Sequence, residues 1–512
     1  MSGFAVTFNN NDCSELEDMI RRIDYRGPYI FGKFEYSCIM MAQKYLRADI
    51  ALEKENMSET WNNMVPAFDQ DFPELRICYD GQMGHWKKYA KACGVPNGPF
   101  REERLFLRLY REHGIKMFDC LDDAIFAFVI SDGKKFFAAR DLLGIKTLFY
   151  GKKDNMLYLG SELKSIIGFT DEVYEFPPGH YMDQTGQITC FAKLPNTPPA
   201  PMRTDIDEIT AAVRDIINRS FHNRIDFSVE TGSLLSGGID SSVVTAIAGR
   251  AYRKKFGKNA RIKTFALGVG ESEDIECARV MADFIGSDHH ELIVDLEQIM
   301  DVLPEVIYYL ESFDPSLVRS SVPNYLISRY AGKEGIEVLL SGEGSDEVFC
   351  GYQYFKNFST QELFARQMEC IGFLHNNASL RLDRMNLCNS IRVVAPLISG
   401  ELLNYAMSIP PEYKLRPDGK QKIEKWIFRK AFEDVLPEEI VWRLKQEFSQ
   451  GSGSADVLST LFEEFITDDE FSAERKKHPV VRNKEELFYF RIFAENFGTG
   501  KAVETVGQWI SL

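Results

Sequence analysis

The sequence predicts an α/β protein of two domains, the first built on antiparallel sheets and the second on a parallel sheet flanked by helices. Three observations carry this prediction. Short β-rich runs fill about the first 190 positions, strands alternate with helical segments from residue 206, and a proline-rich stretch lies between them. The length of 512 residues also exceeds one ordinary core, so at least two domains are expected.

The N-terminal segment, residues 1–193, contains runs such as GFAVTF, AIFAFVIS, KKFFAAR and TLFYG, separated by turn residues. This spacing favours antiparallel sheets with a few helices between them. Residues 194–205 follow, with four prolines between Pro195 and Pro201. Proline lacks an amide donor and fixes φ, so neither a sheet nor a helix continues through this stretch, and we expect a linker there.

The C-terminal segment, residues 206–512, changes to a strand–helix alternation. Helical periodicity in IDEITAAVRDIINRSF precedes an apolar run, VETGSLL, and the same order repeats through VVTAIAGRAYRKKF, RIKTFALGV, DIECARVMADFIG and HHELIVD. Such alternation indicates a parallel sheet with right-handed crossovers. Beyond about Gln361 the pattern is mainly helical.

Composition narrows the classes of function. A formal charge of −16 argues against a nucleic-acid binder, which needs a basic face. The ten cysteines contain no CxxC pair, as expected of a reduced intracellular chain without a zinc or dithiol site. The sequence shows no signal peptide and no uncharged apolar run of the ~18–20 residues that a membrane span needs. We therefore expect a soluble cytoplasmic protein that acts on small molecules.

The stretch LLSGGIDSSVV joins a predicted strand to a predicted helix through a glycine turn. In open α/β sheets this is the position that binds ligands, and the helix N-terminus attracts anions. Asp240 fits a polyphosphate site only with a cation between them, for which Mg²⁺ is the natural candidate. A serine-capped structural turn explains the motif about equally well. The candidate phosphate-binding residues are Leu235, Ser236, Gly237, Gly238, Asp240 and Ser241.

A second acidic glycine turn, VLLSGEGSDEV, lies about a hundred residues later and also leaves an apolar run. It contains Ser341, Gly342 and Glu343, and it could place Asp346 across a metal ion from Asp240. Farther along, Lys445 stands beside a polar glycine segment, where a lysine could neutralise charge on a leaving pyrophosphate. Three such features together are more specific than any one of them.

These motifs resemble the asparagine synthetase B family of ATP-pyrophosphatases, in which a glutaminase-type domain precedes a synthetase domain. The resemblance covers nearly the whole chain, with RGPY at Arg26, RDLLGIKTLFYG at Arg140, GSELKSI at Gly160, FPPGHY at Phe176 and SFDPSLVRSSVPNYL around Arg319. It implies an Ntn-hydrolase-like αββα sandwich followed by an ATP-pyrophosphatase domain. It also implies ATP and Mg²⁺ as cofactors and suggests a homodimer.

The reaction that the family implies is AMP-forming: a carboxylate attacks the α-phosphate of ATP, and a nitrogen nucleophile then displaces AMP. On the matching positions, Glu343 would be the general base, Lys445 would stabilise the departing charge and Arg319 would steady phosphoryl charge. Asp240 and Asp346 would share the metal ion. The residues expected to hold ATP or pyrophosphate are Leu235, Ser236, Gly237, Gly238, Asp240, Ser241, Leu267, Ser341 and Gly342.

The glutaminase part departs from the family pattern. The nucleophilic cysteine is replaced by Ser2, the asparagine that assists the oxyanion by Asp80, and the glutamate that recognises the substrate ammonium by Gln82. The expected glutamine-binding segments are also absent from KYLRADIALEKE and GPFREERL. We expect a degenerate glutaminase domain, although Ser2 could still serve an unrecognised hydrolase as an N-terminal nucleophile.

The acceptor segment departs as well. In SIRVVAPLIS, Arg392 could hold a carboxylate, but serines stand at positions 390 and 399, where the family has acidic residues. The leading hypothesis is an amide ligase that adenylates a carboxylate and uses ammonia or an amine without hydrolysing glutamine, in specialised metabolite biosynthesis. The alternatives are an ammonia-dependent asparagine synthetase, a β-lactam-synthetase-like ring closure, a pyrophosphatase-type tRNA modifier and a non-catalytic partner protein.

Overall fold

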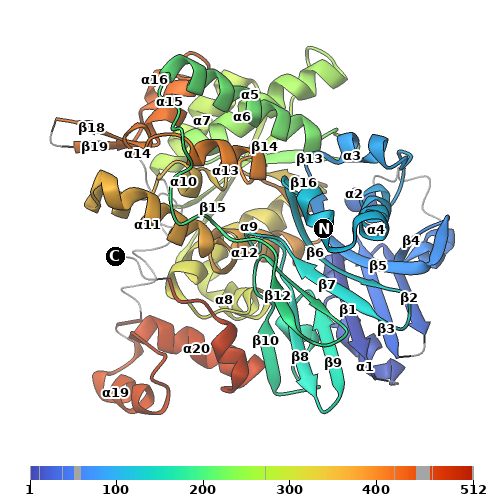
Figure 1. Cartoon of the computed structure of the whole chain (residues 1–512). Coiled ribbons are helices and arrows are strands. Elements are labelled where there is room, and N and C mark those ends of the chain that lie inside the picture. The colour runs from blue at the N-terminus through green and yellow to red at the C-terminus, as the bar shows by residue number, and fades with distance from the viewer. Residues whose placement is uncertain are drawn as a thin grey trace.

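The computed structural model of the chain describes residues 2–10, 12–36, 38–50, 59–270, 272–419, 421–444, 462–463 and 465–509. The blue and cyan strands of the N-terminal half gather on one side of the molecule, and the helices of the C-terminal half surround a separate sheet (Figure 1). The predicted change from antiparallel to parallel architecture is confirmed, because the first two sheets are antiparallel throughout and the third is parallel.

Two six-stranded sheets form the N-terminal half. The first has the order β10 (Glu172–Glu175), β8 (Phe149–Lys153), β9 (Met156–Gly160), β1 (Ser2–Phe8), β3 (Ile39–Tyr45) and β2 (Ile30–Tyr36). The second has the order β12 (Ile188–Cys190), β11 (His180–Asp183), β7 (Phe136–Arg140), β6 (Ala124–Ser131), β5 (Phe72–Met83) and β4 (Ala67–Asp69).

Side-chain alternation explains how these sheets stack. Along β1, Phe4 and Val6 enter a core that also contains Val129 of β6, whereas Ala5 between them packs in the core of α1 (Cys13–Arg21). Successive strand residues point to opposite faces, so one strand serves both cores. The second sheet packs its other face against α3 (Trp86–Ala92) and α4 (Arg101–His113). The result is the expected αββα sandwich.

The C-terminal sheet has five parallel strands. Their order is β15 (Asp288–Val294), β14 (Lys263–Val269), β13 (Thr231–Leu234), β16 (Val338–Leu340) and β17 (Arg392–Val394). The inner strands β14, β13 and β16 are largely buried on both faces, as is usual in a parallel sheet, whereas the edge strand β15 is mostly half-buried. Val338 and Leu340 pack with α5 (Ile206–Arg224), α6 (Ile239–Phe256) and α7 (Glu273–Ile285), whereas Leu339 packs with α8 (Leu296–Leu310) and α9 (Pro315–Lys333).

Shorter elements complete the C-terminal half, as the helical pattern predicts. The helices are α10 (Ser345–Val348), α11 (Thr360–Gly372), α12 (Ala378–Leu387), α13 (Gly400–Met407), α14 (Pro411–Lys414), α15 (Trp426–Phe432), α16 (Glu438–Val441), α19 (Asp468–Lys477) and α20 (Lys484–Phe497). A hairpin, β18 (Leu415–Asp418) and β19 (Gln421–Glu424), was not expected. In the described part of the chain, no helix combines the length and apolarity that crossing a membrane requires.

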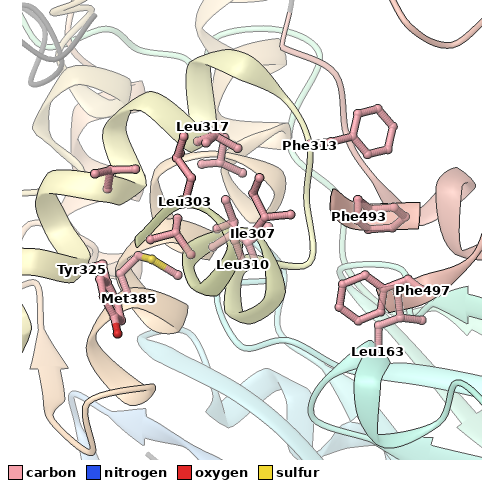
Figure 2. Close-up of a cluster of buried hydrophobic side chains, with 14 of the residues drawn as sticks. Leu163, Leu303, Ile307, Leu310, Phe313, Leu317, Tyr325, Met385, Phe493 and Phe497 are labelled. Carbon is pink, nitrogen blue, oxygen red and sulfur yellow. The ribbon is translucent and has the colours of Figure 1, made fainter. Parts of the chain in front are cut away.

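The two halves share a hydrophobic core. Figure 2 shows Leu163 of the N-terminal half beside Phe497 of α20, with Leu303 and Ile307 of α8 and Met385 of α12 farther along the same cluster. Burial of each such side chain contributes roughly 1.5–3 kcal/mol. The proline stretch lies between β12, which ends at Cys190, and α5, which begins at Ile206.

Candidate active site

The two glycine turns meet at the carboxyl ends of neighbouring strands. β13 leads into the first turn and β16 into the second, and these strands pair in parallel through Ser233 and Leu340. The contact between the turns is tight: a Cβ on Gly342 would lie 2.5 Å from the carbonyl carbon of Asp240 and from the amide nitrogen of Ser241. Only a glycine allows this approach, so Gly342 sets the spacing of the two turns.

The first turn combines a helix N-terminus with serine hydroxyls. Gly238 is the N-cap of α6, and the Ser241 hydroxyl donates to its carbonyl oxygen at 3.1 Å. The Ser241 oxygen also accepts from the Ser236 amide at 3.2 Å. Gly237 lies against α7: its φ is +70°, and a Cβ there would lie 2.3 Å from the Cys277 Cβ. Gly237 thus permits helix packing, while Gly238 faces the cavity.

A cavity of about 180 Å³ opens between the two turns. It brings together most of the side chains that the sequence singled out. The predicted residues that line it are Ser236, Gly238, Asp240, Ser241, Ser341, Gly342, Glu343 and Asp346. Polar residues of α9 and α12 complete the wall, together with the indole of Trp509.

Lys425 lies at the centre of this site, and sequence reasoning missed it. Its side chain is fully buried, with Nζ 2.6 Å from Asp240 Oδ2, 2.7 Å from Asp346 Oδ1 and 2.9 Å from the Ser345 hydroxyl. The residue precedes α15 in the left-handed region, with φ of +54°. The sequence EKWIF carries no pattern that would mark this lysine. Lys425 lies between the end of β19 and the start of the short helix α15, far along the chain from both glycine turns.

Arg381 is the second cation that the sequence did not reveal. It projects from α12 into the cavity and forms an ion pair with Glu343 of the second turn. Directly behind this turn, Glu347 is 2% exposed and accepts from the Tyr352 hydroxyl at 2.6 Å. Burial, followed by the charges of Asp346 and Glu343, raises the pKa of Glu347 to about 7.

Four predicted residues lie elsewhere. Arg319 pairs with Glu485, Nε to Oε1 2.8 Å, and does not line the cavity. Leu267 packs in the core with α8 and α9, and Leu235 is 1% exposed in the core with α6. Arg392 donates to the Ala48 carbonyl of the N-terminal half at 2.9 Å, away from the cavity.

Lys445 lies outside the described residues, and Leu444 immediately before it lines the cavity.

The carboxylates fit a divalent cation bound together with a polyphosphate. Asp240 Oδ1 is buried and has no hydrogen-bond partner, as expected of an oxygen that awaits a metal ion. Mg²⁺ binds through one or two carboxylates and takes its other ligands from phosphates and water. Within the described part of the chain, no cluster of three or more His, Cys, Asp or Glu side chains forms a complete cation cage. Asp240 and Asp346, one from each glycine turn, match the Mg²⁺ pattern of one or two carboxylates completed by phosphates and water.

The position of the missing cysteine is closed by hydrogen bonds. Ser2 is 1% exposed, and its hydroxyl donates to the Tyr79 carbonyl at 2.5 Å and accepts from Gln43 Nε2 at 2.8 Å. Asp80 is fully buried and accepts from the Ser2 amide at 3.2 Å. The cavity beside Ser2 measures only about 30 Å³, and Gln82 lies 4% exposed outside its lining.

Asp80 belongs to a cluster of eight buried charges at the domain boundary, which we call the interface cluster. Its cations are Arg26, Lys146, Lys164 and Arg384, and its anions are Asp80, Glu162, Glu311 and Asp383. No side chain among them is more than 3% exposed. Arg26 contacts Asp80 at 2.7 Å and Asp383 of α12 at 3.0 Å, so the carboxylate that is hydrogen-bonded to the Ser2 amide is tied to the C-terminal half.

Opposite charges overcome the cost of burial in this cluster. Burial alone would raise the pKa of Asp383, but Lys146 and Arg26 lower it to about 2. The pKa of Glu162 is likewise held well below its usual range, because Arg384, Lys164 and Arg26 outweigh its burial. These carboxylates are therefore ionised at neutral pH and stabilised only while their partners remain.

Comparison with known proteins agrees with this architecture. Residues 212–377 and 361–502 match the family described as asparagine synthase, and residues 66–168 match the glutamine amidotransferase domain. A probable asparagine synthetase (glutamine-hydrolyzing) from Dictyostelium discoideum is 33% identical over 100% of this chain and 96% of the relative. Asparagine synthetase (glutamine-hydrolyzing) 1 from Saccharomyces cerevisiae is 31% identical over the same shares, 100% and 96%.

A probable asparagine synthetase (glutamine-hydrolyzing) from Schizosaccharomyces pombe is 34% identical over 79% of this chain and 78% of the relative. The family matches fall on the two halves that the fold separates, the amidotransferase match on the αββα sandwich and the synthase match on the parallel-sheet half. The chain therefore belongs to the asparagine synthase family.

Proposed function

We propose that this protein is an ATP-dependent, AMP-forming amide ligase that activates a carboxylate and transfers it to ammonia or an amine, without hydrolysing glutamine. The observation that carries the ligase part is the cavity between the two glycine turns, which gathers serine hydroxyls, a helix N-terminus and the carboxylates of Asp240, Glu343 and Asp346. Membership of the asparagine synthase family supports the same chemistry.

The proposed reaction has two steps. In the first, a substrate carboxylate oxygen attacks the α-phosphorus of ATP, a new O–P bond forms, and the bond to pyrophosphate breaks. In the second, the nitrogen nucleophile attacks the activated carbonyl carbon, the bond to AMP breaks, and the nitrogen loses a proton. The products are an amide, AMP and pyrophosphate.

The chain's own groups suit these steps. The amide end of α6 and the hydroxyls of Ser236 and Ser241 supply donors to phosphate oxygens, and the helix dipole favours the anion. Mg²⁺, held by Asp240 and Asp346, would neutralise charge on the pyrophosphate. Glu343 is the proposed acceptor of the proton from the nitrogen, and its ion pair with Arg381 fixes its position. Lys445 remains the proposed partner of the departing pyrophosphate.

The absence of glutaminase activity is proposed from the N-terminal half. The Ser2 hydroxyl is engaged on both sides, and the cavity of about 30 Å³ next to it is far smaller than the cavity of about 180 Å³ between the glycine turns. Asp80 presents a negative charge where an oxyanion would need a donor. The relatives, by contrast, are named as glutamine-hydrolyzing enzymes, so this part of the proposal distinguishes the present chain from them.

Aspartate is the acceptor that the names of the relatives favour, and an ammonia-dependent asparagine synthetase is therefore the second candidate. Arg392 does not line this cavity, so its proposed contact with an acceptor carboxylate requires a substrate that extends beyond the lining. We propose a specialised carboxylate other than aspartate, because serines stand at positions 390 and 399 where the family has acidic residues.

The test is pyrophosphate release from ATP and Mg²⁺ with aspartate, supplied with ammonium, with glutamine or without a nitrogen source. We expect glutamine to give no more amide than the control without nitrogen. With the carboxylate that an ATP–pyrophosphate exchange screen identifies, we expect Glu343→Gln to lower the ammonium-dependent rate by roughly 10²–10⁴-fold. Asparagine formed with ammonium would establish the second candidate. A rate with glutamine that Ser2→Ala abolishes would refute the loss of glutaminase activity. Failure of ATP–pyrophosphate exchange across a carboxylate screen would refute the ligase.

A further inference from the structure

The cation position between Asp240 and Asp346 is already filled by a residue of the chain. The Lys425 ammonium lies 2.6 Å from one carboxylate and 2.7 Å from the other, and a third bond reaches the Ser345 hydroxyl at 2.9 Å. These two carboxylates are the ones proposed to bind Mg²⁺. An ammonium and a divalent cation cannot both lie between them at close range, because like charges repel strongly in a buried site.

The surrounding structure is built to hold this lysine there. Its backbone adopts a left-handed conformation, φ +54°, which is unfavourable for a non-glycine residue and is retained only where the surroundings impose it. Arg429 fixes the preceding residue through its Nε to the Glu424 carbonyl at 2.9 Å and through Nη2 to the Glu424 carboxylate at 2.6 Å. A Cβ on Gly351 would lie 2.0 Å from both Lys425 Cε and Asp346 Oδ1, so only glycine leaves room.

We propose that Lys425 is an internal counter-ion that makes metal binding depend on the nucleotide. Without ATP, its ammonium satisfies both carboxylates and competes with Mg²⁺. When a nucleotide enters, its phosphates offer the ammonium another anionic partner in the same cavity, and the carboxylates become available to the metal ion. The metal therefore enters with the nucleotide rather than before it. This inference rests on the proposed ATP site but not on the identity of the acceptor or of the nitrogen source.

The counter-ion explains two features together. Asp240 Oδ1 is buried without a hydrogen-bond partner, so the lysine leaves one ligand position of the carboxylate ready for a metal ion. The carboxylates at the turns would otherwise repel one another before any ligand arrived, because Asp240, Asp346 and Glu343 line one cavity. A buried ammonium removes that repulsion in the free enzyme. Lys425 thus stabilises the free enzyme and, when a nucleotide binds, couples nucleotide binding to metal binding.

The test is direct metal binding to the full chain, with Mn²⁺ followed by electron paramagnetic resonance as a substitute for Mg²⁺. For the wild type, we expect an analogue of ATP with a non-cleavable α,β bridge to tighten Mn²⁺ binding by roughly 10- to 100-fold. In Lys425→Met, Mn²⁺ should bind without the analogue at least about tenfold more tightly than in the wild type, and the analogue should add little. Mg²⁺ alone should raise the melting temperature of this variant and leave that of the wild type unchanged.

Lys356→Met is the matched control, because Lys356 pairs with Glu424 at 2.8 Å and does not line the cavity. It should behave as the wild type does, and Asp346→Asn should abolish Mn²⁺ binding, so that the signal of the free ion is undiminished. Equal Mn²⁺ affinity of the wild type with and without the analogue would overturn the proposal, even if Lys425→Met failed to fold. If the protein fails the carboxylate screen but shows this coupling, the counter-ion role of Lys425 stands and the proposed ligase reaction does not.

Discussion

Carboxylates meet buried cations in two regions of this molecule, and the regions differ in the burial of the carboxylates and in how the charges balance. The interface cluster has four cations and four anions, all enclosed. At the glycine turns, three carboxylates, Asp240, Glu343 and Asp346, contact two cations, Lys425 and Arg381, beside an open cavity. Asp274, which also lines the cavity, pairs separately with Arg443 at 2.8 Å.

The difference separates structure from function. A balanced and sealed set of charges has no position left for a ligand, and its worth lies in holding the two halves in register. At the glycine turns themselves, three carboxylates share two cations, and such an excess of negative charge is costly unless a further cation arrives. The interface cluster includes Asp80 beside Ser2, whereas the cavity lies in the C-terminal half. The enclosed charges tie the two halves together, and the charges at the turns leave a position that a ligand can fill.

The largest expected effect comes from breaking the interface cluster at its centre. Arg26→Met leaves Asp80, Glu162 and Asp383 without a shared cation, and each is at most 3% exposed. Removing one partner of a buried ion pair typically costs about 3–5 kcal/mol. We expect a loss of that size in the free energy of unfolding, measured by urea denaturation monitored with tryptophan fluorescence.

An exposed ion pair provides the comparison. Glu17 and Lys33 contact each other at 2.9 Å with side chains 57% and 42% exposed, so Glu17→Ala should cost less than about 1 kcal/mol. If Arg26→Met were no more destabilising than this control, the interface cluster would not be the link between the halves that its burial implies.

A smaller effect is expected from Asp80→Asn, which restores the amide typical of the family. The variant leaves the cluster with one excess cation, although Arg26 keeps Glu162 at 2.6 Å and Asp383 at 3.0 Å. We expect a loss of about 1–3 kcal/mol in the free energy of unfolding by the same urea titration. Combined with Ser2→Cys, it should still not hydrolyse glutamine, because the cavity there is about 30 Å³. Higher stability of Asp80→Asn, or glutamine hydrolysis by the double variant, would contradict this expectation. It would mean that the residues at positions 2 and 80 alone account for the loss of glutaminase activity.

Much of this fold could be predicted because its signals are local. The alternation in GFAVTF and the strand–glycine–helix order in LLSGGIDSSVV mark β1 and the turn between β13 and α6 directly. The two turns could also be assigned to one site, since the carboxyl ends of neighbouring parallel strands lie at one edge of a sheet. The β18–β19 hairpin was missed, because its strands have four residues each and a proline at position 417.

The residues that the sequence could not reveal are those placed by tertiary packing. Lys425 lies 185 positions from Asp240, and Arg381 lies 38 positions from Glu343. Both look like ordinary helix-surface charges in the sequence. The motif around Arg319 predicts a place beside a phosphate, whereas the structure pairs its guanidinium with Glu485 on α20. Its contact with a phosphate stays a prediction. Charge partners across long separations depend on the whole fold, and local patterns carry no information about them.

The smallest expected effect concerns Glu103, a buried carboxyl for which the described part of the chain shows no ion pair. Glu103 on α4 is 5% exposed and lines the small cavity beside Ser2. Burial, reinforced by Glu102, raises its pKa from 4.5 to about 7. A raised carboxyl pKa gives stability that is complete below about pH 4.5 and is lost as the pH rises through 7.

Glu103→Gln should therefore remove part of the pH dependence of unfolding. Between pH 6 and 8, we expect the wild type to lose about 1 kcal/mol relative to this variant, in paired urea titrations. Glu17→Gln, at a 57% exposed position whose ion-pair partner is Lys33, should leave the pH profile unchanged. A wild-type profile parallel to that of Glu103→Gln would mean that this carboxyl is already neutralised by a neighbour. The charges around the small cavity beside Ser2 would then be as fully balanced as those of the interface cluster.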